Sequence, residues 1–269
     1  MQVFAAAPLP PSRATAQSRI TAAQEKSSQS LLLTENVRSI GGPPALFEGL
    51  SQAEREIVLK HGTRRVFYRG QTLFNQGSKN DGIFLIETGR VRVFYTAPSQ
   101  REITLAYWLP GNFVGGPEIF DGGVHQWSGV ASSNSSAVHL SGKNLRKLVV
   151  EVPSLAIGLI EGLAFKGKCY SALAQMLGTR SITERLAQLL LHLVDLYGVK
   201  DPEGVAIAAA FTHTDLAHMV GATRQWVTIS LKRLHEKNVV ISRKSRIVVR
   251  RLDVLQEMRS QKDRAHLPL

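Results

Sequence analysis

Cysteine is nearly absent from this chain: Cys169 is the one thiol among 269 residues. A lone cysteine forms no internal disulfide, and it cannot hold a four-thiolate iron–sulfur cluster or a structural zinc ion. The sequence therefore excludes an iron–sulfur cofactor and predicts a reduced, cytoplasmic protein.

Long apolar runs are missing as well. No run reaches the roughly 18 apolar residues that a membrane span needs, so no span is predicted. The N-terminal residues 1–42 lack a basic start followed by a sustained apolar stretch, which argues against a signal peptide. Their Ala, Ser, Gln and Pro content predicts a flexible extension without a fold of its own.

Acidic residues are the minority charge. The chain has 33 Lys and Arg against 21 Asp and Glu, and its formal net charge of +12 predicts an anionic partner, either nucleic acid or a membrane surface. Apolar residues make up 43% of the chain, which is enough for a buried core, and the length suits two ordinary domains.

The motifs of common enzymes are also lacking. The sequence has no Gly-x-Ser-x-Gly, no phosphate-binding loop and no His-Glu-x-x-His, and its 8 histidines are scattered. We therefore expect neither catalysis nor a metal site.

The first half of the chain has the sequence pattern of a β-domain. Ser51 with Glu54 three residues later predicts a capped short helix. From Thr63 to about Leu140, runs of β-forming residues alternate with glycine-bearing turns. Short strands at this spacing are typical of a compact β-barrel or jelly roll.

After residue 152 the spacing of the apolar residues changes to that of a helix. Pro153 opens a stretch to about Tyr197 that has no further proline. Its apolar stripe comprises Leu155, Leu159, Leu163, Lys166, Tyr170, Leu173, Met176 and Leu177, followed by Leu186, Leu189, Leu190, Leu193 and Leu196. A long helix usually buries such a stripe against another helix, and we expect a second copy of the chain to supply it. The alternative is that the stripe packs on its own barrel.

The C-terminal part predicts a helix-turn-helix. Thr212 and Asp215 cap a first helix, and Gly221 supplies a tight turn in which positive φ is allowed. Thr223 caps a second helix that runs through Leu234. Helix, short glycine turn and helix is the layout of a DNA-binding helix-turn-helix.

The second helix carries side chains that can read the major groove. Arg224 can pair with guanine, Gln225 with adenine, and Lys232 with phosphate. Residues 239–241 and 246–249 predict a two-stranded wing, and residues 224–251 hold nine basic residues against one acidic residue. The predicted DNA contacts are Thr212, His213, Thr223, Arg224, Gln225, Thr228, Lys232, Arg243 and Lys244. A basic solvated surface is the plainer alternative.

Taken together, these segments resemble the cyclic-AMP receptor/FNR family of bacterial transcription regulators. Residues 68–77 and 82–93 look like its barrel hairpins, 109–115 like the turn before its effector pocket, and 211–249 like its winged helix. The resemblance implies an α+β protein with four parts: a jelly-roll, cyclic-nucleotide-binding-like barrel (43–152), a dimerisation helix (153–197), a winged helix-turn-helix (198–252) and a tail (253–269). It also implies a homodimer on two-fold-related double-stranded DNA, contact with RNA polymerase, and a small-molecule effector in the barrel.

The family's ligand-binding residues are only partly present. Gly116 stands where cyclic-nucleotide binders of the family have Glu, and residues 125–128 replace their Arg–Ser pair. Without that arginine the charge of a cyclic phosphate is unpaired, so we expect an effector other than cyclic AMP. Gly115 and Pro117 replace the Cys and His ligands of the haem-containing branch, although haem remains an alternative through His125 or His139.

The cofactor therefore stays unknown. The expected effector pocket comprises Tyr107, Trp108, Phe113, Gly115, Gly116, Glu118, Gln126, Trp127, Ser128 and Tyr170. Its aromatic content suits a small hydrophobic or aromatic effector. The same residues could instead form core, the regulator could act without an effector, or the barrel could belong to a regulatory module that binds no DNA. In the second helix, Gln225 and Ile229 replace an acidic residue and an arginine of the family, which predicts half-sites unlike the family's usual ones.

Overall fold

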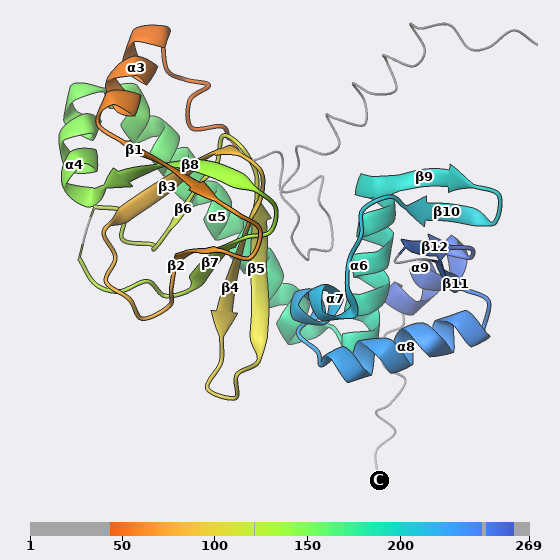
Figure 1. The fold of residues 1–269 in the computed structure, drawn as a ribbon. Helices are drawn as coiled ribbons and strands as arrows, with labels where there is room; N and C mark the ends of the chain where they lie inside the picture. Colours follow the sequence, from red (N-terminus) through yellow and green to blue (C-terminus); the bar gives the residue numbers. More distant parts are fainter. Residues whose placement is uncertain (1–43, 121, 244–245, 261–269) are drawn as a thin grey trace, which may run out of the picture.

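The computed structural model describes residues 44–120, 122–243 and 246–260. A β-barrel, a long helix beside it and a C-terminal helical unit follow one another along the chain (Figure 1). This confirms the predicted α+β class. The expected extension over residues 1–42 lies outside the described residues.

Two four-stranded antiparallel sheets make up the barrel, with strand orders β1-β8-β3-β6 and β2-β7-β4-β5. Phe84 of the first sheet and Phe74 of the second stack with ring centroids 6.0 Å apart, so the core lies between the sheets. The barrel strands are β1 (Thr63–Phe67), β2 (Thr72–Phe74), β3 (Gly82–Thr88), β4 (Val91–Thr96), β5 (Glu102–Trp108), β6 (Phe113–Gly115), β7 (Ser128–Ala131) and β8 (Ser135–Ser141).

Three helices adjoin the barrel. The capping box between Ser51 and Glu54 opens α3 (Gln52–Lys60), as predicted. Helices α4 (Gly142–Glu151) and α5 (Pro153–Thr179) meet at an angle of 120°. Among the described residues no single helix is long and apolar enough to cross a membrane, and only this bent pair has the required length and composition.

The predicted single helix over residues 153–197 is wrong in one respect, because the chain forms two helices. Helix α5 ends at Thr179, Arg180 is extended, and α6 (Ile182–Tyr197) begins after Ser181. The Ser181 side chain accepts a hydrogen bond from the backbone N–H of Glu184, whose carboxylate accepts one from the backbone N–H of Ser181 at 2.8 Å. This capping box satisfies N–H groups at the start of α6, so a new helix begins there.

The apolar stripe of α5 is covered by other parts of the same chain. Leu155 and Leu159 pack with α3, α4 and the β1-β8-β3-β6 sheet of the barrel, whereas Leu173 and Met176 join the core of the C-terminal unit. Packing on the chain's own barrel, the alternative weighed for this stripe, is therefore what the structure shows for its first half, and a partner copy would have to use a different face of α5.

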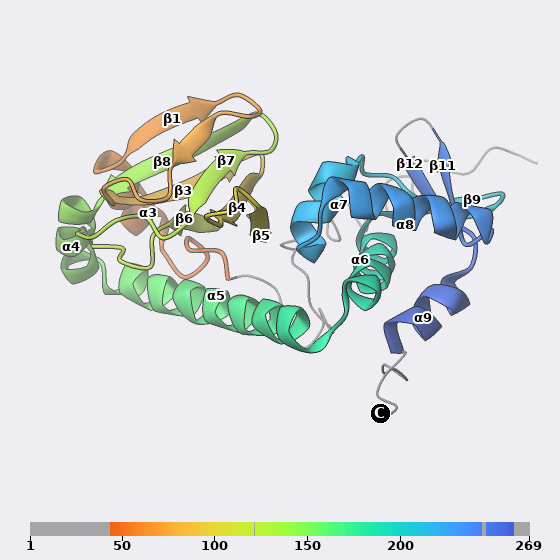
Figure 2. The same ribbon diagram turned by 90° about the horizontal axis from the view of Figure 1, so that it is seen from below.

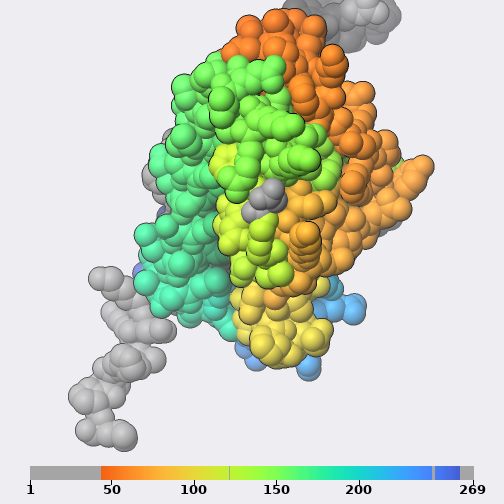
Figure 3. All heavy atoms as spheres, turned by 90° about the vertical axis from the view of Figure 1, so that its left-hand side faces the viewer, coloured from red at the N-terminus to blue at the C-terminus, as the bar shows by residue number. Residues whose placement is uncertain are grey.

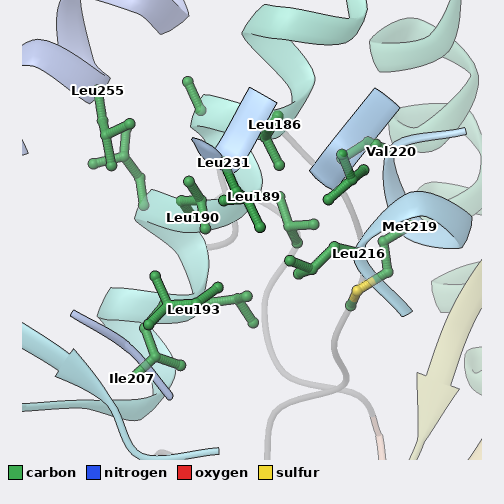
Figure 4. Close-up of a cluster of buried hydrophobic side chains, with 14 of the residues drawn as sticks. Leu186, Leu189, Leu190, Leu193, Ile207, Leu216, Met219, Val220, Leu231 and Leu255 are labelled. Atoms are coloured by element: carbon green, nitrogen blue, oxygen red, sulfur yellow. The ribbon is translucent and has the colours of Figure 1, made fainter. Parts of the chain in front are cut away.

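The C-terminal unit has one core, built around α6 (Figure 4). Its remaining elements are β9 (Gly198–Asp201), β10 (Gly204–Ile207), α7 (His213–Val220), α8 (Arg224–Glu236), β11 (Val240–Arg243), β12 (Arg246–Val249) and α9 (Leu252–Ser260). Leu255 of α9 is fully buried against this core. The predicted C-terminal tail over residues 253–269 is therefore wrong for residues 253–260, which belong to α9. Residues 261–269 lie outside the described part.

Candidate DNA interface and effector cavity

The geometry of the helix-turn-helix follows from three short-range features. The Thr212 side chain accepts a hydrogen bond from the N–H of Asp215, which forms a capping box at the start of α7. Gly221 ends α7 with φ 66° and ψ 44°, a left-handed conformation that favours glycine. The Thr223 side chain then accepts from the N–H of Trp226 and begins α8.

The outer face of α8 is open to solvent. Val227, Leu231 and Leu234 are buried against α6 and α7. The predicted reading residues on the opposite face are all exposed: Thr223, Arg224, Gln225, Thr228 and Lys232. Figure 2, which views the molecule from below, shows α8 lying across the front of the C-terminal unit.

Thr228 is held in place by two hydrogen bonds. Its hydroxyl donates to the carbonyl of Arg224 at 2.9 Å and lies 2.8 Å from Nδ1 of His213. Since the hydroxyl proton points to Arg224, the His213 Nδ1 must donate. This contact ties the first turn of α7 to the outer face of α8. Thr212 and His213 also line a cavity of 740 Å³ between the barrel and the C-terminal unit.

The wing forms as predicted, but one acidic residue from outside it binds its arginines. Strands β11 and β12 pair with Val240 opposite Val249, and β10 extends their sheet. The Glu203 carboxylate, in the turn between β9 and β10, pairs with both Arg243 and Arg250. Glu203 was not predicted as part of this surface because it lies outside residues 224–251, over which the charges were counted. Lys244 lies outside the described residues.

A cavity of 190 Å³ opens between the barrel and α5. Its lining includes six of the ten predicted pocket residues, namely Trp108, Phe113, Gly115, Gly116, Trp127 and Tyr170, together with Val93, Val114, Pro117, Leu163, Lys166 and Gly167. The Trp127 indole N–H donates to the carbonyl of Gly115 at 2.7 Å, and its ring meets Tyr170 edge-on at 5.5 Å.

The other four predicted residues lie elsewhere. Tyr107 is buried in the core of the C-terminal unit, where desolvation raises its pKa to about 12. Glu118 and Gln126 are exposed, and the Gln126 amide donates to the carbonyl of Val124. The Ser128 hydroxyl accepts from the N–H of Gln76 at 2.9 Å. Successive side chains of a strand point to opposite faces, so Tyr107 points away from the cavity that its neighbour Trp108 lines.

Lys166 is the one charged residue in the described lining of the cavity, and it was not among the predicted pocket residues. Its side chain is 9% exposed, and Nζ donates to the carbonyl of Phe113 at 2.7 Å. Nζ also lies 3.6 Å from the ring centroid of Trp108 and 4.5 Å from that of Phe113. Burial lowers the pKa of Lys166 to about 7. In the sequence this lysine counted as part of the helical stripe, and its spacing alone does not reveal a cavity.

The two histidines considered as haem ligands are not in the lining of this cavity. His125 stacks on Phe74 with ring centroids 4.5 Å apart, and His139 lies 4.7 Å from the Phe84 ring and 3.3 Å from Asp81. Burial lowers the pKa of both imidazoles. The described lining of the cavity contains no His, Cys or Met, so the histidines considered as haem ligands are not part of it.

The barrel also touches the helix-turn-helix directly, because α7 lies against β5. Arg92 of β4 pairs with Glu102 of β5, and its guanidinium contacts His218 of α7 at 2.7 Å. Arg101, at the tip of the same hairpin, donates to the carbonyl of Gly221 in the turn of the helix-turn-helix. We call Arg92, Glu102, Arg101, His218 and Gly221 the interdomain contact.

A jelly-roll barrel joined to an exposed helix-turn-helix is the architecture of a two-domain DNA-binding protein. Two family models match it: the cyclic nucleotide-binding domain over residues 64–151, and the Crp-like helix-turn-helix domain over residues 184–258. Together they cover more than half of the chain. The chain therefore belongs to the cyclic-AMP receptor/FNR family of DNA-binding transcription regulators, as the sequence patterns indicated.

Named relatives agree with this assignment. The chain is 28% identical over 213 residues to the cyclic AMP receptor protein of Thermus thermophilus, covering 79% of this chain and 95% of the relative. It is 27% identical over 214 residues to the CRP-like cAMP-activated global transcriptional regulator of Mycobacterium tuberculosis, covering 76% and 95%.

Solved structures share the fold. The c-di-GMP-responsive global regulator CLP of Xanthomonas campestris superposes with a TM-score of 0.68 at 19% identity, over 74% of this chain and 99% of that one. A crp/fnr-family regulator from Eubacterium rectale gives a TM-score of 0.64 at 16% identity, over 80% and 98%.

The described lining of the cavity contains no arginine, and its charged residue is Lys166. Gly116 stands where cyclic-nucleotide binders of the family have Glu, and residues 125–128, which replace their Arg–Ser pair, contain no arginine. A volume of 190 Å³ is also below the roughly 300 Å³ at which pockets for drug-sized ligands begin.

Proposed function

We propose that this chain is a cytoplasmic, homodimeric transcription regulator that binds a two-fold-related DNA site in a sequence-specific way. It acts together with RNA polymerase, and a small effector other than cyclic AMP controls it from the 190 Å³ cavity. The observation that carries the proposal is the exposed row of Arg224, Gln225, Thr228 and Lys232 on a helix that follows a glycine turn.

The residue types along this row support direct reading of base pairs. An arginine at the N-terminal end of a recognition helix can donate two hydrogen bonds to guanine, and Gln225 can pair with adenine. Ile229, which is 43% exposed, can contact a thymine methyl group. Lys232, two turns after Arg224, suits a phosphate.

The outer face of α5 supports a homodimer. Seven exposed residues recur along it at alternating spacings of three and four: Ile157, Ile160, Ala164, Gly167, Ser171, Ala174 and Gly178. This is the heptad spacing of a two-helix seam, and small side chains let two helices approach closely. In Figure 3, α5 runs in sea green down one side of the molecule beside the barrel. We call these seven residues the α5 seam.

Selection of DNA sites from a random pool, followed by gel-shift titration, tests the function. Arg224→Ala should reduce the preference for one guanine by about 1 to 3 kcal/mol. Lys232→Ala should instead weaken binding to all sequences alike and lower the salt slope by about one. Uniform weakening by Arg224→Ala would show that this arginine does not read a base, and a pool without enrichment would favour a module that binds no DNA.

A further inference from the structure

The cavity contains a buried lysine without a carboxylate partner. The described lining of the cavity includes no Asp or Glu, and no salt bridge among the described residues involves Lys166. Its Nζ has one hydrogen-bond acceptor, the Phe113 carbonyl, and lies on the Trp108 ring face. An ammonium group has three N–H donors, so this environment leaves the charged form incompletely satisfied.

An anion is the ligand that would best complete this environment. Desolvation lowers the pKa of Lys166 to about 7, opposed by the nearby thiol of Cys169 but by no carboxylate in the described lining. A carboxylate that entered the cavity would favour the charged lysine and form a charge-assisted hydrogen bond in a region that excludes water.

The rest of the cavity suits a single ring. Trp108, Phe113, Trp127 and Tyr170 supply aromatic walls, and the remaining side chains in the lining are mostly aliphatic. An apolar cavity of about 150 Å³ holds one benzene molecule. A cavity of 190 Å³ therefore has room for one ring and a small polar group.

We propose that the effector is a small carboxylic acid with one ring, whose carboxylate pairs with Lys166 while its ring lies among Trp108, Trp127 and Tyr170. This inference rests on the proposed function, because it names the chemical class of the effector for the same cavity.

The position of Lys166 connects such binding to the DNA-binding unit. Its Nζ holds α5 to the start of β6 through the Phe113 carbonyl. A carboxylate competes for that ammonium group and so alters the attachment of α5 to the barrel. Further along α5, Leu173 and Met176 pack in the core around α6, so a displacement of α5 reaches the helix-turn-helix through packed side chains.

Isothermal titration calorimetry of the full-length protein with benzoate tests this inference. At pH 8 the free lysine, whose pKa is lowered to about 7, is mostly neutral, so binding of the anion should be accompanied by proton uptake, as measured in buffers of different ionisation enthalpy. Benzamide, a neutral molecule of similar shape, should bind at least about tenfold more weakly and take up no proton.

Matched variants on one helix separate the lysine's role from general effects of charge. Lys166→Met should abolish proton uptake and weaken benzoate binding at least about tenfold, whereas Lys168→Met, which removes an exposed lysine two residues away, should change neither. Equal affinities for benzoate and benzamide in the wild-type protein would overturn the inference without relying on any variant. So would the absence of benzoate binding at millimolar concentration.

The DNA selection separates this inference from the proposed function. Enrichment of a DNA site by a protein that fails the benzoate test would reject the acid effector and leave the regulator in place. Benzoate binding with proton uptake but no enriched site would support the inference about the cavity and reject the DNA-binding role.

Discussion

The guanidinium of Arg92 lies 2.7 Å from Nδ1 of His218, and this contact joins the barrel to the first helix of the helix-turn-helix. Arg92 donates, so Nδ1 accepts and the imidazole is neutral, with its proton on Nε2. The same guanidinium pairs with Glu102, which fixes its orientation between β5 and α7. Because the partners come from both domains, the contact can couple the state of the barrel to the position of α7.

Arg92→Gln should loosen the interdomain contact without unfolding either unit. The Arg92 side chain is only 11% exposed, and a hydrogen bond to a charged group contributes about 1.5 to 3 kcal/mol. Opening between the units should therefore become about tenfold more frequent or more, as measured by hydrogen exchange of the amides in β5 and α7. Arg64→Gln, which removes an arginine–glutamate pair within the barrel, should leave this exchange unchanged. Equal effects of the two variants would contradict a specific role for Arg92.

The interdomain contact should also weaken as the pH falls. Burial, and then Arg92, lower the pKa of His218, whereas Glu102 and Asp215 oppose that shift. His218 therefore has a lower pKa when docked than when α7 is free, where the ordinary value of about 6.5 applies. The docked state is fully favoured above about pH 6.5 and loses stability as the pH drops below that value towards the lowered pKa.

Hydrogen exchange at pH 7.5 and pH 5.5, corrected for the intrinsic rate of each amide, measures this effect. His218→Gln keeps a polar side chain but cannot titrate, so its docking should be nearly independent of pH over this range. A pH dependence of equal size in His218→Gln would assign the effect to other groups.

Glu203→Gln should strengthen DNA binding. The Glu203 carboxylate pairs with Arg243 and Arg250 of the wing and competes with phosphate for them. Its removal should raise the affinity at low salt and steepen the salt dependence by up to about two released counterions. Glu87→Gln, which makes the same change of charge in the barrel, provides the control. A similar gain in both variants would show that net charge alone is responsible. Stability should change little, because Arg243 is 55% exposed.

Local signals made much of this structure predictable from its sequence. Thr212 with Asp215, Gly221 and Thr223 each fix a helix end through short-range hydrogen bonds or backbone conformation, so the helix-turn-helix could be placed to within a residue or two. The same kind of signal was present at Ser181 and Glu184, but the continuous run of leucines obscured it, and the break between α5 and α6 was missed.

Features that depend on distant parts of the chain could not be predicted in this way. Glu203 meets Arg243 only because β9 and β10 join the sheet of the wing. Lys166 lies at an apolar position of the helical stripe, and only the packing of α5 on the barrel shows that it reaches a cavity. Likewise, the apolar stripe predicted a helical stretch but neither its division into α5 and α6 nor the elements that cover it.

The last prediction concerns the α5 seam. Ala164 lies in the middle of the seam and is exposed in the single chain. In a dimer, Ala164→Glu would place two carboxylates against each other in a closely packed interface, where desolvated like charges repel. We expect the variant to be monomeric, by light scattering after size-exclusion chromatography, at concentrations where the wild type is a dimer. Its affinity for a two-fold-related DNA site should fall because the two half-sites no longer bind as one unit.

Val150→Glu places the same acid at an 80% exposed position on α4 and should leave the dimer intact. If Ala164→Glu stayed dimeric while Val150→Glu dissociated, α4 rather than the α5 seam would form the interface.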